Sequence, residues 1–538
     1  MSKAMCAILA ISVLAPGAHA QAELQIINGA AQALGGKARI QAVKALTIEG
    51  EGSDANLGQN VTPDGELPVW KVTGYQQTID LANGRMRIRE KRTAQFLFAA
   101  ATVQYQDQGL DGDIAYNVGQ NGAPMRASAE AARDRRINML HHPITMVRAA
   151  LDPGAKASNL RREGEQQLVD ITTAKGDRLT LAVSNATKLP MRVTSMSYNA
   201  NLGDVAVETS FLDYEEVSGL KLPRHLVTKV DKYPQFDLRI TKNIVDVPAG
   251  DLSAPEAVKS APLPAPPVIT VTAEPVAKGI WWLAGSGNHR SILFEFDDHL
   301  TLFEVPLNEA RSKAVIDKAR SVVPGKPLTE AIVSHHHFDH SGGLRVAVAE
   351  GLTIITYRGN AAFFQELVAR KHSIVQDELA RNPKPLKLIP VDDELTLKDK
   401  SMEVHLYHLK DNPREGTNLF AYVPRDRILV QADLYDSTWT QYPWEDNVVH
   451  NIALRKLQVD RDVPVHGAIE SWAEVLKTMQ SRGSGENRGA PREAGSPAES
   501  DAGSVAAGVQ PMTLAIVWVP SLWWQQRFPW SPDGRRLP

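Results

Sequence analysis

Ser334-His335-His336-His337-Phe338-Asp339-His340-Ser341-Gly342-Gly343 is the segment from which the second half of the chain is best understood. It follows Ala331-Ile332-Val333, an apolar run that predicts a strand. In an extended segment His335 and His337 point to the same side and can ligate one ion, while Asp339 and His340 follow at a turn and can reach a second. Two zinc ions about 3.5 to 4 Å apart would suit such a cluster. The acid and the Gly-Gly pair, which lets backbone approach closely, favour a metal site over a surface run of histidines.

Two more residues of metal-ligand type follow, each at the end of a short strand-like run. Asp433 comes after Ile428-Leu429-Val430-Gln431-Ala432, and His466 lies in Val463-Pro464-Val465-His466-Gly467. Together, the His-x-His-x-Asp-His run, the later Asp and the final His-Gly resemble the metallo-β-lactamase fold superfamily of hydrolases. The resemblance covers about 268–479 and implies the α/β class, with an αββα sandwich.

The same resemblance implies a set of metal ligands. His335 and His337 would hold the first zinc, and Asp433 would bridge the two ions. The second zinc would be held by Asp339, His340 and His466.

The third ligand of the first zinc is not where this family has it, because the loop 412–417 contains no histidine. Strand alternation puts Val404, Leu406 and His408 on one inward face, so His408 is our preferred ligand. Two alternatives stay open: Glu415 as an oxygen ligand, or a first site bound by only two side chains.

A second departure from the family is Glu304-Val305-Pro306, where an Asp-Thr-Gly-like turn often supports the ligands. We expect its loss to disturb the orientation of the ligands, an effect that typically changes affinity or activity roughly ten- to a hundredfold.

These residues predict a zinc-dependent hydrolase. If both sites fill, a water between the ions loses a proton near neutral pH and becomes the nucleophile. Asp339 could bind zinc and orient that hydroxide, so it is the predicted catalytic residue. We expect a small-molecule ester, thioester, lactone or related bond as substrate. The resemblance argues against β-lactamases, because the mature chain has no cysteine to hold a second zinc and Asp433 stands where other β-lactamases of the superfamily carry serine. The alternative is a periplasmic binding protein for an apolar ligand, with a degenerate metal domain.

Composition and the N-terminus indicate the compartment. A net charge of -3 gives no support for nucleic acid as a partner. Lys3, the apolar run Met5 to Leu14 and the small-x-small site Ala18-His19-Ala20 predict a signal peptide over 1–20 that is too short to span a bilayer. The mature protein would be periplasmic or secreted, without a membrane span. Cys6, the only cysteine, would leave with the signal, so the mature chain has no disulfide and no thiolate for zinc.

The first half, 21–250, predicts a β-rich antiparallel domain. After a helix over about 24–34, alternating strands dominate, and Asn83-Gly84 predicts a hairpin. A helix over about 130–140, resuming at 143–151, could cover one face of the sheet. The pattern resembles the curved sheets of periplasmic lipoprotein-carrier proteins. His141 and His142, beside the break in the helix, are expected to be structural.

A segment rich in Pro and Ala, 251–268, predicts a semi-rigid linker to the metal domain at 269–480. The remaining 481–538 begins with a run rich in Gly, Ser, Ala, Glu and Arg, which predicts a disordered or atypical tail.

Overall fold

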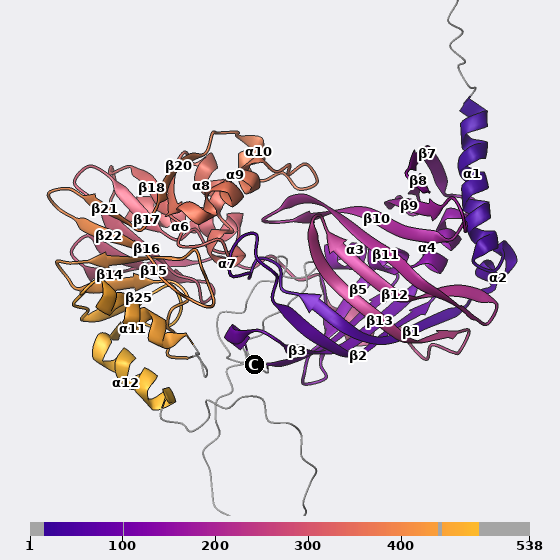
Figure 1. Ribbon diagram of the computed structural model, residues 1–538, viewed down its shortest axis with the longest axis horizontal. Helices are drawn as coiled ribbons and strands as arrows, with labels where there is room; N and C mark the ends of the chain where they lie inside the picture. The colour runs from indigo at the N-terminus through magenta and orange to yellow at the C-terminus, as the bar shows by residue number, and fades with distance from the viewer. Residues whose placement is uncertain (1–15, 100–101, 439–443, 484–538) are drawn as a thin grey trace, which may run out of the picture.

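The computed structural model describes residues 16–99, 102–438 and 444–483. It is mostly β-sheet with some helices, and its two halves lie side by side along the long axis (Figure 1). The predicted signal peptide and Cys6 lie outside the described residues, except for 16–20, which begin the first helix. Of the predicted tail, only 481–483 are described, as the end of the last helix. None of the helices in these ranges has the length and hydrophobicity that a transmembrane span needs.

The first half is built on one 13-stranded sheet, in which neighbouring strands pair antiparallel in the order β6-β5-β4-β3-β2-β1-β13-β12-β11-β10-β9-β8-β7. The hairpin predicted at Asn83-Gly84 is confirmed: Asp80 pairs with Arg85, and Gly84 takes a φ of 66°. The strands are β1 (Ala45–Ala55), β2 (Val69–Asp80), β3 (Arg85–Ala94), β4 (Val103–Asp111), β5 (Ile114–Val118), β6 (Pro124–Arg126), β7 (Lys156–Glu163), β8 (Gln166–Thr172), β9 (Arg178–Ser184), β10 (Pro190–Asn199), β11 (Gly203–Val217), β12 (Leu220–Val230) and β13 (Tyr233–Val245).

Helices cover one face of this sheet, as the sequence predicts. They are α1 (Pro16–Ala33), α2 (Lys37–Ala42), α3 (Ala129–Leu140) and α4 (Pro143–Ala150), and the short η1 (Leu97–Ala99) follows β3. Ile27, Ile144 and Val147 from the helices share a buried core with sheet residues such as Leu46 and Leu181.

The two histidines at the break between α3 and α4 are structural, as expected. The ring nitrogens of His141 lie 2.9 Å from the hydroxyls of Thr209 and Ser195, so this buried side chain ties the helices to the sheet. His142 caps α4, because its Nδ1 accepts a hydrogen bond from the backbone N–H of Ile144 at 3.3 Å.

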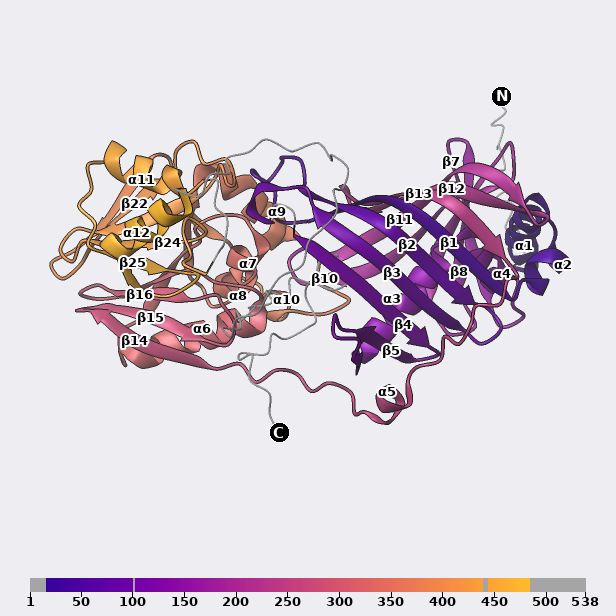
Figure 2. The same ribbon diagram turned by 90° about the horizontal axis from the view of Figure 1, so that it is seen from below.

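The segment 251–268 runs along one side of the molecule between the two halves and contains the short helix α5 (Glu256–Ser260), as Figure 2 shows.

The second half contains two further sheets. The 7-stranded sheet has the order β14-β15-β16-β17-β18-β19-β20, with β17 to β20 parallel, and the 6-stranded sheet has the order β21-β22-β23-β24-β25-β26. The first consists of β14 (Val271–Ala277), β15 (Ile280–Gly285), β16 (Ser291–Glu295), β17 (Leu300–Phe303), β18 (Leu328–Ile332), β19 (Thr353–Tyr357) and β20 (Lys387–Val391). The second consists of β21 (Glu394–Lys398), β22 (Glu403–His408), β23 (Leu419–Val423), β24 (Ile428–Gln431), β25 (Arg461–Pro464) and β26 (Glu470–Ser471).

The two sheets face each other, and helices lie on their outer sides. Phe294 and Phe303 of the first sheet share one buried core with Leu406 and Val430 of the second. Helices α6 (Glu309–Val322), α8 (Leu344–Ala349), α9 (Ala361–Ala369) and α10 (Glu378–Arg381) pack on the other side of the first sheet, and α11 (Glu445–Leu454) and α12 (Trp472–Gly483) on that of the second. The short α7 (Phe338–Ser341) and η2 (Arg358–Asn360) complete the half. Because β17 is covered on both faces, all four of its residues are buried and apolar or hydrogen-bonded.

The two halves pack directly against each other. Leu57 and Leu202 of the first half belong to the same buried cluster as Phe338 and Phe363 of the second. At the rim of this contact the Lys232 ammonium lies 2.9 Å from a carboxylate oxygen of Glu366. The interface therefore combines an apolar centre with charged edges.

Candidate metal centre

The histidine run lies on the loop between β18 and α7, as the sequence predicts. A hydrogen bond anchors the start of this loop, because the backbone N–H of Ser334 donates to Oε1 of Glu304 at 2.9 Å. His335, His337 and His340 are all fully buried. Their positions are thus set by the sheet and by the packing around the loop.

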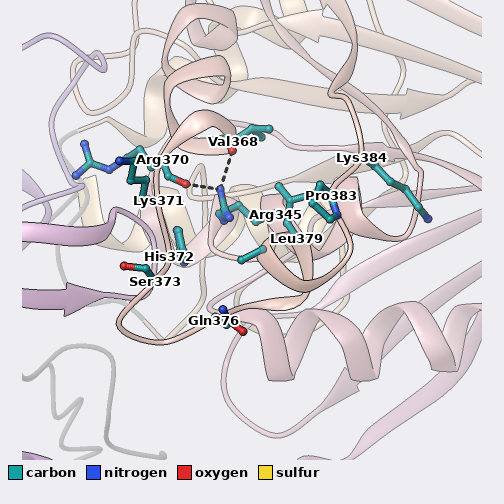
Figure 3. A pocket seen from close by; sticks show the side chains of 11 residues that line it. Arg345, Val368, Arg370, Lys371, His372, Ser373, Gln376, Leu379, Pro383 and Lys384 are labelled. Carbon is teal, nitrogen blue, oxygen red and sulfur yellow. Dashed lines mark hydrogen bonds between the residues drawn. The ribbon is translucent and has the colours of Figure 1, made fainter.

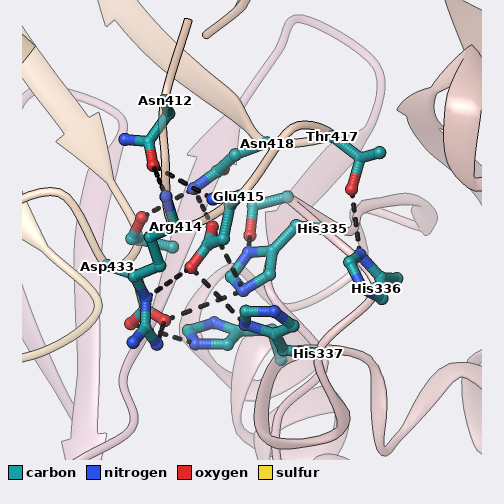
Figure 4. A network of polar contacts seen from close by, with 12 residues as sticks. His335, His336, His337, Asn412, Arg414, Glu415, Thr417, Asn418 and Asp433 are labelled. Atoms are coloured by element: carbon teal, nitrogen blue, oxygen red, sulfur yellow. Dashed lines mark hydrogen bonds and ion pairs between the residues drawn. The ribbon is translucent and has the colours of Figure 1, made fainter. Parts of the chain in front are cut away.

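A first group of potential ligands consists of His335, His337, Glu415 and Asp433, whose ligand atoms all lie within 4.8 Å of one another (Figure 4). Glu415 lies between the two histidines, with its carboxylate oxygens 3.4 Å from Nε2 of His335 and 3.4 Å from Nδ1 of His337. Asp433 Oδ2 is 3.7 Å from Nε2 of His335.

A second group consists of His289, Asp339, His340 and His466, again with ligand atoms within 4.8 Å. Asp433 connects it to the first group, because its Oδ1 lies 3.2 Å from Nε2 of His340 and 2.9 Å from Nε2 of His466. The structure thus brings together Asp339, His340, His466 and Asp433 from three separate parts of the chain.

The donor atoms of the first group fit a bound divalent metal. Nε2 of His335 and Nδ1 of His337 are buried, and within the described part of the chain neither has a hydrogen-bond partner. The other nitrogen of each ring is engaged: Nδ1 of His335 lies 2.8 Å from the Ser334 hydroxyl, and Nε2 of His337 donates to the carbonyl of Asn60 at 2.9 Å. Because a carbonyl can only accept, Nε2 of His337 carries the hydrogen, and its inward Nδ1 presents a lone pair to Glu415. Imidazole and carboxylate groups are common ligands of divalent metals.

The protonation states of three histidines also favour metal binding. Burial and the neighbouring imidazoles hold the pKa of His335 well below its ordinary value. Burial, followed by the charge of Arg414, lowers the pKa of His337 to about 4, and burial, followed by His466, lowers the pKa of His289 to about 4. These rings are neutral at pH 7, so they need not lose a proton before they ligate a metal.

His340 and Asp433 differ from these three histidines, because neighbouring charges hold both of them in their charged forms. Burial by itself lowers the pKa of His340, but the carboxylates of Asp433, Asp339 and Glu304 outweigh it and raise that pKa well above its ordinary value. Burial by itself raises the pKa of Asp433, but the charges of Arg414 and His340 outweigh it and hold that pKa well below its usual range. A metal bound to His340 would have to replace a proton there.

The structure does not place His408, our preferred third ligand of the first group, in either group. Strand alternation holds as far as Val404 and Leu406, which are buried in the core between the sheets. His408, however, is the last residue of β22, where its Nε2 lies 3.1 Å from the carbonyl of Gly416 and its ring stacks on Tyr357. The loop after it returns across the site and places Glu415, the open alternative, in the first group.

His289 is a member of the second group that the sequence analysis missed. It lies on the connection between β15 and β16, where Gly285 and Gly287 have φ values of 126° and 86°. Its Nε2 lies 3.2 Å from Oδ2 of Asp339. The available signal was a histidine in a glycine-containing loop between two strands, which is a position typical of ligands.

Glu304, which we expected to weaken the support of the ligands, instead contacts the ligand loop with its carboxylate. Its buried carboxylate accepts a hydrogen bond from Nδ1 of His340 at 3.0 Å, in addition to the one from the Ser334 amide. Its backbone is in the left-handed region, with a φ of 78°. Glu304 therefore supplies a carboxylate that orients a histidine of the second group.

Arg414, whose role no local sequence pattern predicts, is a buried cation beside the first group. Its Nε donates to Oε1 of Glu415 at 2.8 Å, and its guanidinium also pairs with Asp433 (Figure 4). The guanidinium carbon lies 4.3 Å from the ring centre of Phe98, which comes from the first half, and 5.5 Å from that of Trp444. The two carboxylates of the first group are thus already paired with a positive charge.

A separate cavity of about 380 Å³ lies beside α8, α9 and α10, with Arg345, Arg370 and Lys384 among its lining residues (Figure 3). Arg345 forms two hydrogen bonds with Asp377 and donates to the carbonyl of Val368 at 2.8 Å. The buried charge of this cavity is therefore neutralised by the protein itself.

No known family model and no curated protein matches the chain. Solved structures of metallo-β-lactamase-fold proteins are similar to about 40% of it. One is a metallo-beta-lactamase from Pontibacter korlensis, with 13% identity, coverage of 40% of this chain and 98% of that chain, and a TM-score of 0.32. Another is the FIM-1 metallo-beta-lactamase from Pseudomonas aeruginosa in its mono-zinc form, with 16% identity, coverage of 40% and 95%, and a TM-score of 0.31. A third is the metal-soaked Flv1 flavodiiron core from Synechocystis sp. PCC6803, with 17% identity, coverage of 40% and 61%, and a TM-score of 0.32. Likeness this distant does not carry an activity over to this chain.

Proposed function

We propose that this protein is a zinc-dependent hydrolase with a metallo-β-lactamase-like αββα sandwich, acting on a small-molecule ester, thioester, lactone or related bond. One observation carries the proposal: two groups of ligand atoms meet at Asp433, and the inward ring nitrogens of His335 and His337 have no hydrogen-bond partner among the described residues. A layered arrangement of helices outside two facing sheets is consistent with it.

In this proposal each group holds one zinc, so the chain would bind two. His335, His337 and Glu415 would hold one ion, and the second group would hold the other, with Asp433 shared between them. Bound zinc would supply a Lewis acid and a water with a pKa of about 7.

The chain itself would position that water through Asp339. Its Oδ1 accepts a hydrogen bond from the side-chain amide of Gln59 at 2.8 Å, and its Oδ2 faces Nε2 of His289 at 3.2 Å. Burial by itself raises the pKa of Asp339, but the charge of His340 and the hydrogen bonds from His289 and His340 together outweigh it and keep that pKa well below its ordinary value. Asp339 therefore stays an acceptor, and we assign it the role of orienting the attacking water.

The remaining parts of the chain complete the proposal. Residues 1–20 would be a signal peptide, which implies a periplasmic or secreted protein. Residues 21–250 would form a domain like the periplasmic lipoprotein carriers, joined by the linker 251–268 to the metal domain 269–480, with an atypical tail at 481–538. The antiparallel sheet covered by helices supports the assignment of the first domain.

A binding protein for an apolar ligand, with a degenerate metal domain, is the second candidate. The observation that favours it is the guanidinium of Arg414, which already compensates Glu415 and Asp433.

Elemental analysis combined with a substrate screen distinguishes the two candidates. We expect two zinc ions per chain, and hydrolysis that disappears on chelation and in His337→Ala. His405→Ala is the matched control, because His405 is a partly exposed histidine that pairs with Glu403 outside both groups. Full activity in the metal-free protein would refute the hydrolase mechanism, and a chain that binds no zinc and hydrolyses nothing would support the binding protein.

A further inference from the structure

A loop of the first half enters the metal centre of the second. It is the connection between β1 and β2, residues 56–68, and in Figures 1 and 2 it extends from the end of the large sheet to the second half. Four consecutive residues of this loop each make a hydrogen bond to a segment that carries ligands. The carbonyl of Gly58 accepts from Phe338 N at 3.3 Å, Gln59 Nε2 donates to Asp339 Oδ1 at 2.8 Å, the carbonyl of Asn60 accepts from His337 Nε2 at 2.9 Å, and the carbonyl of Val61 accepts from Gly416 N at 2.8 Å.

The loop has the internal structure that such contacts require. The side-chain amide of Asn60 donates to the carbonyls of Thr62 at 2.6 Å and Pro63 at 3.0 Å, which holds the turn together and leaves its own carbonyl for His337. Gly58 has a φ of 78°, and a Cβ atom there would lie 2.4 Å from the ring of Phe338. Only glycine permits this close approach.

The residues that make these contacts are buried. Gln59 and Asn60 are only 5% and 4% exposed, and Leu57 beside them belongs to the apolar core between the halves. Because the carbonyl of Asn60 accepts from Nε2 of His337, that nitrogen carries the hydrogen and Nδ1 presents its lone pair to Glu415. The loop thus fixes the tautomer of one ligand and the orientation of Asp339.

We propose that the first half completes the metal centre: Gln59 is a positioning residue that orients Asp339 through its side-chain amide, and the Asn60 carbonyl sets His337 for metal binding. This inference rests on the proposed zinc site. Groups that orient metal ligands in this way typically change metal affinity or activity 10- to 100-fold when they are removed. The pairing of the two halves in one chain then has a chemical reason, because the second half alone lacks two of the contacts that hold its ligands.

Zinc binding by full-length variants tests the role of Gln59. Gln59→Met keeps the length of the side chain and removes the donor, while Gln59→Ala removes both. Glu66→Ala is the control, since Glu66 is an exposed residue of the same loop. Zinc affinity is measured by competition with a chromophoric chelator, and the melting temperature of each metal-free variant is measured in parallel. We expect both Gln59 variants to bind zinc at the second group, which contains Asp339, about 10- to 100-fold more weakly than wild type, with little change in melting temperature. Glu66→Ala should bind like wild type.

The other outcomes separate this inference from the proposed function. If both Gln59 variants bind zinc as tightly as wild type, this inference is overturned and the proposed function is not. The same holds if Gln59→Met binds like wild type and only Gln59→Ala is weakened, because the side chain would then merely fill space. A wild-type chain that binds no zinc would overturn the proposed function and this inference together.

Discussion

Replacing Arg414 with methionine tests the charge balance of the first group. The guanidinium is almost completely buried, donates to Glu415 at 2.8 Å and pairs with Asp433. Methionine keeps much of the side-chain stem between Phe98 and Trp444 but removes the charge. In the metal-free protein, the two carboxylates would then face each other without their nearest cation, and we expect the second half to become less stable.

The expected loss of stability in Arg414→Met can be estimated from the buried ion pairs. Removing one partner of a buried ion pair costs about 3–5 kcal/mol. Burial and the nearby charge of Asp433 already raise the pKa of Glu415 well above its ordinary value, so this carboxyl can relieve part of the cost by holding a proton. We therefore expect a loss of about 3 kcal/mol without metal, at the lower end of that range. Zinc at a thousand times its Kd stabilises a folded protein by about 4 kcal/mol. Because zinc supplies the positive charge that the guanidinium supplied, the difference between variant and wild type should shrink when zinc is added.

Urea denaturation of the full chain, in chelator and in excess zinc, measures both quantities. Arg427→Met is the matched control, since Arg427 is half exposed and lies 3.6 Å from the exposed Asp460. Such a surface pair contributes about 0–1 kcal/mol, with or without zinc. If Arg414→Met is as stable as wild type in chelator, or if its deficit is the same in both conditions, the guanidinium does not take the place of a metal charge.

Three further predictions concern single residues. Glu415→Gln should lose one equivalent of zinc by elemental analysis while His408→Ala keeps both; the opposite result would restore His408 as the ligand. Glu304→Gln should weaken zinc binding at His340 about 10- to 100-fold in chelator competition, and unchanged affinity would show that its carboxylate does not orient the ring. Burial raises the pKa of Asp462 from 3.8 to about 8, so the folded protein holds this proton more tightly than the unfolded chain. Its contribution to the unfolding free energy is fully present below about pH 4 and is lost as the pH rises through about 8, and Asp462→Asn should flatten that decline in urea denaturation at a series of pH values.

The ligands that could be predicted from sequence are those placed by local geometry. His335 and His337 are two residues apart directly after β18, so an extended backbone turns both side chains the same way. Asp433 and His466 follow β24 and β25, which pair in parallel, and the ends of adjacent parallel strands meet at the same edge of a sheet. In each case the pattern of one or two strands determines the position.

Alternation along a strand, however, predicts the side on which a residue lies and not whether it reaches a particular point. Val404 and Leu406 lie in the core, as the pattern requires, but His408 is at the end of β22 and packs on Tyr357 instead. The position of Glu415 depends on how the following loop folds back over the site. From the sequence of that loop, Glu415 as a ligand and a first site with only two ligands were equally acceptable alternatives.

The contacts from the first half could not be predicted, because nothing local distinguishes them. Gln59 and Asp339 are 280 positions apart, and Asn60 and His337 are 277 apart. In sequence, the loop 56–68 has the polar, proline- and glycine-containing composition of an ordinary connection between strands. Only the packing of the halves through Leu57 and its neighbours gives the amide of Gln59 a chemical role. A metal centre can therefore be recognised from its ligands, while the groups that orient those ligands depend on the tertiary fold.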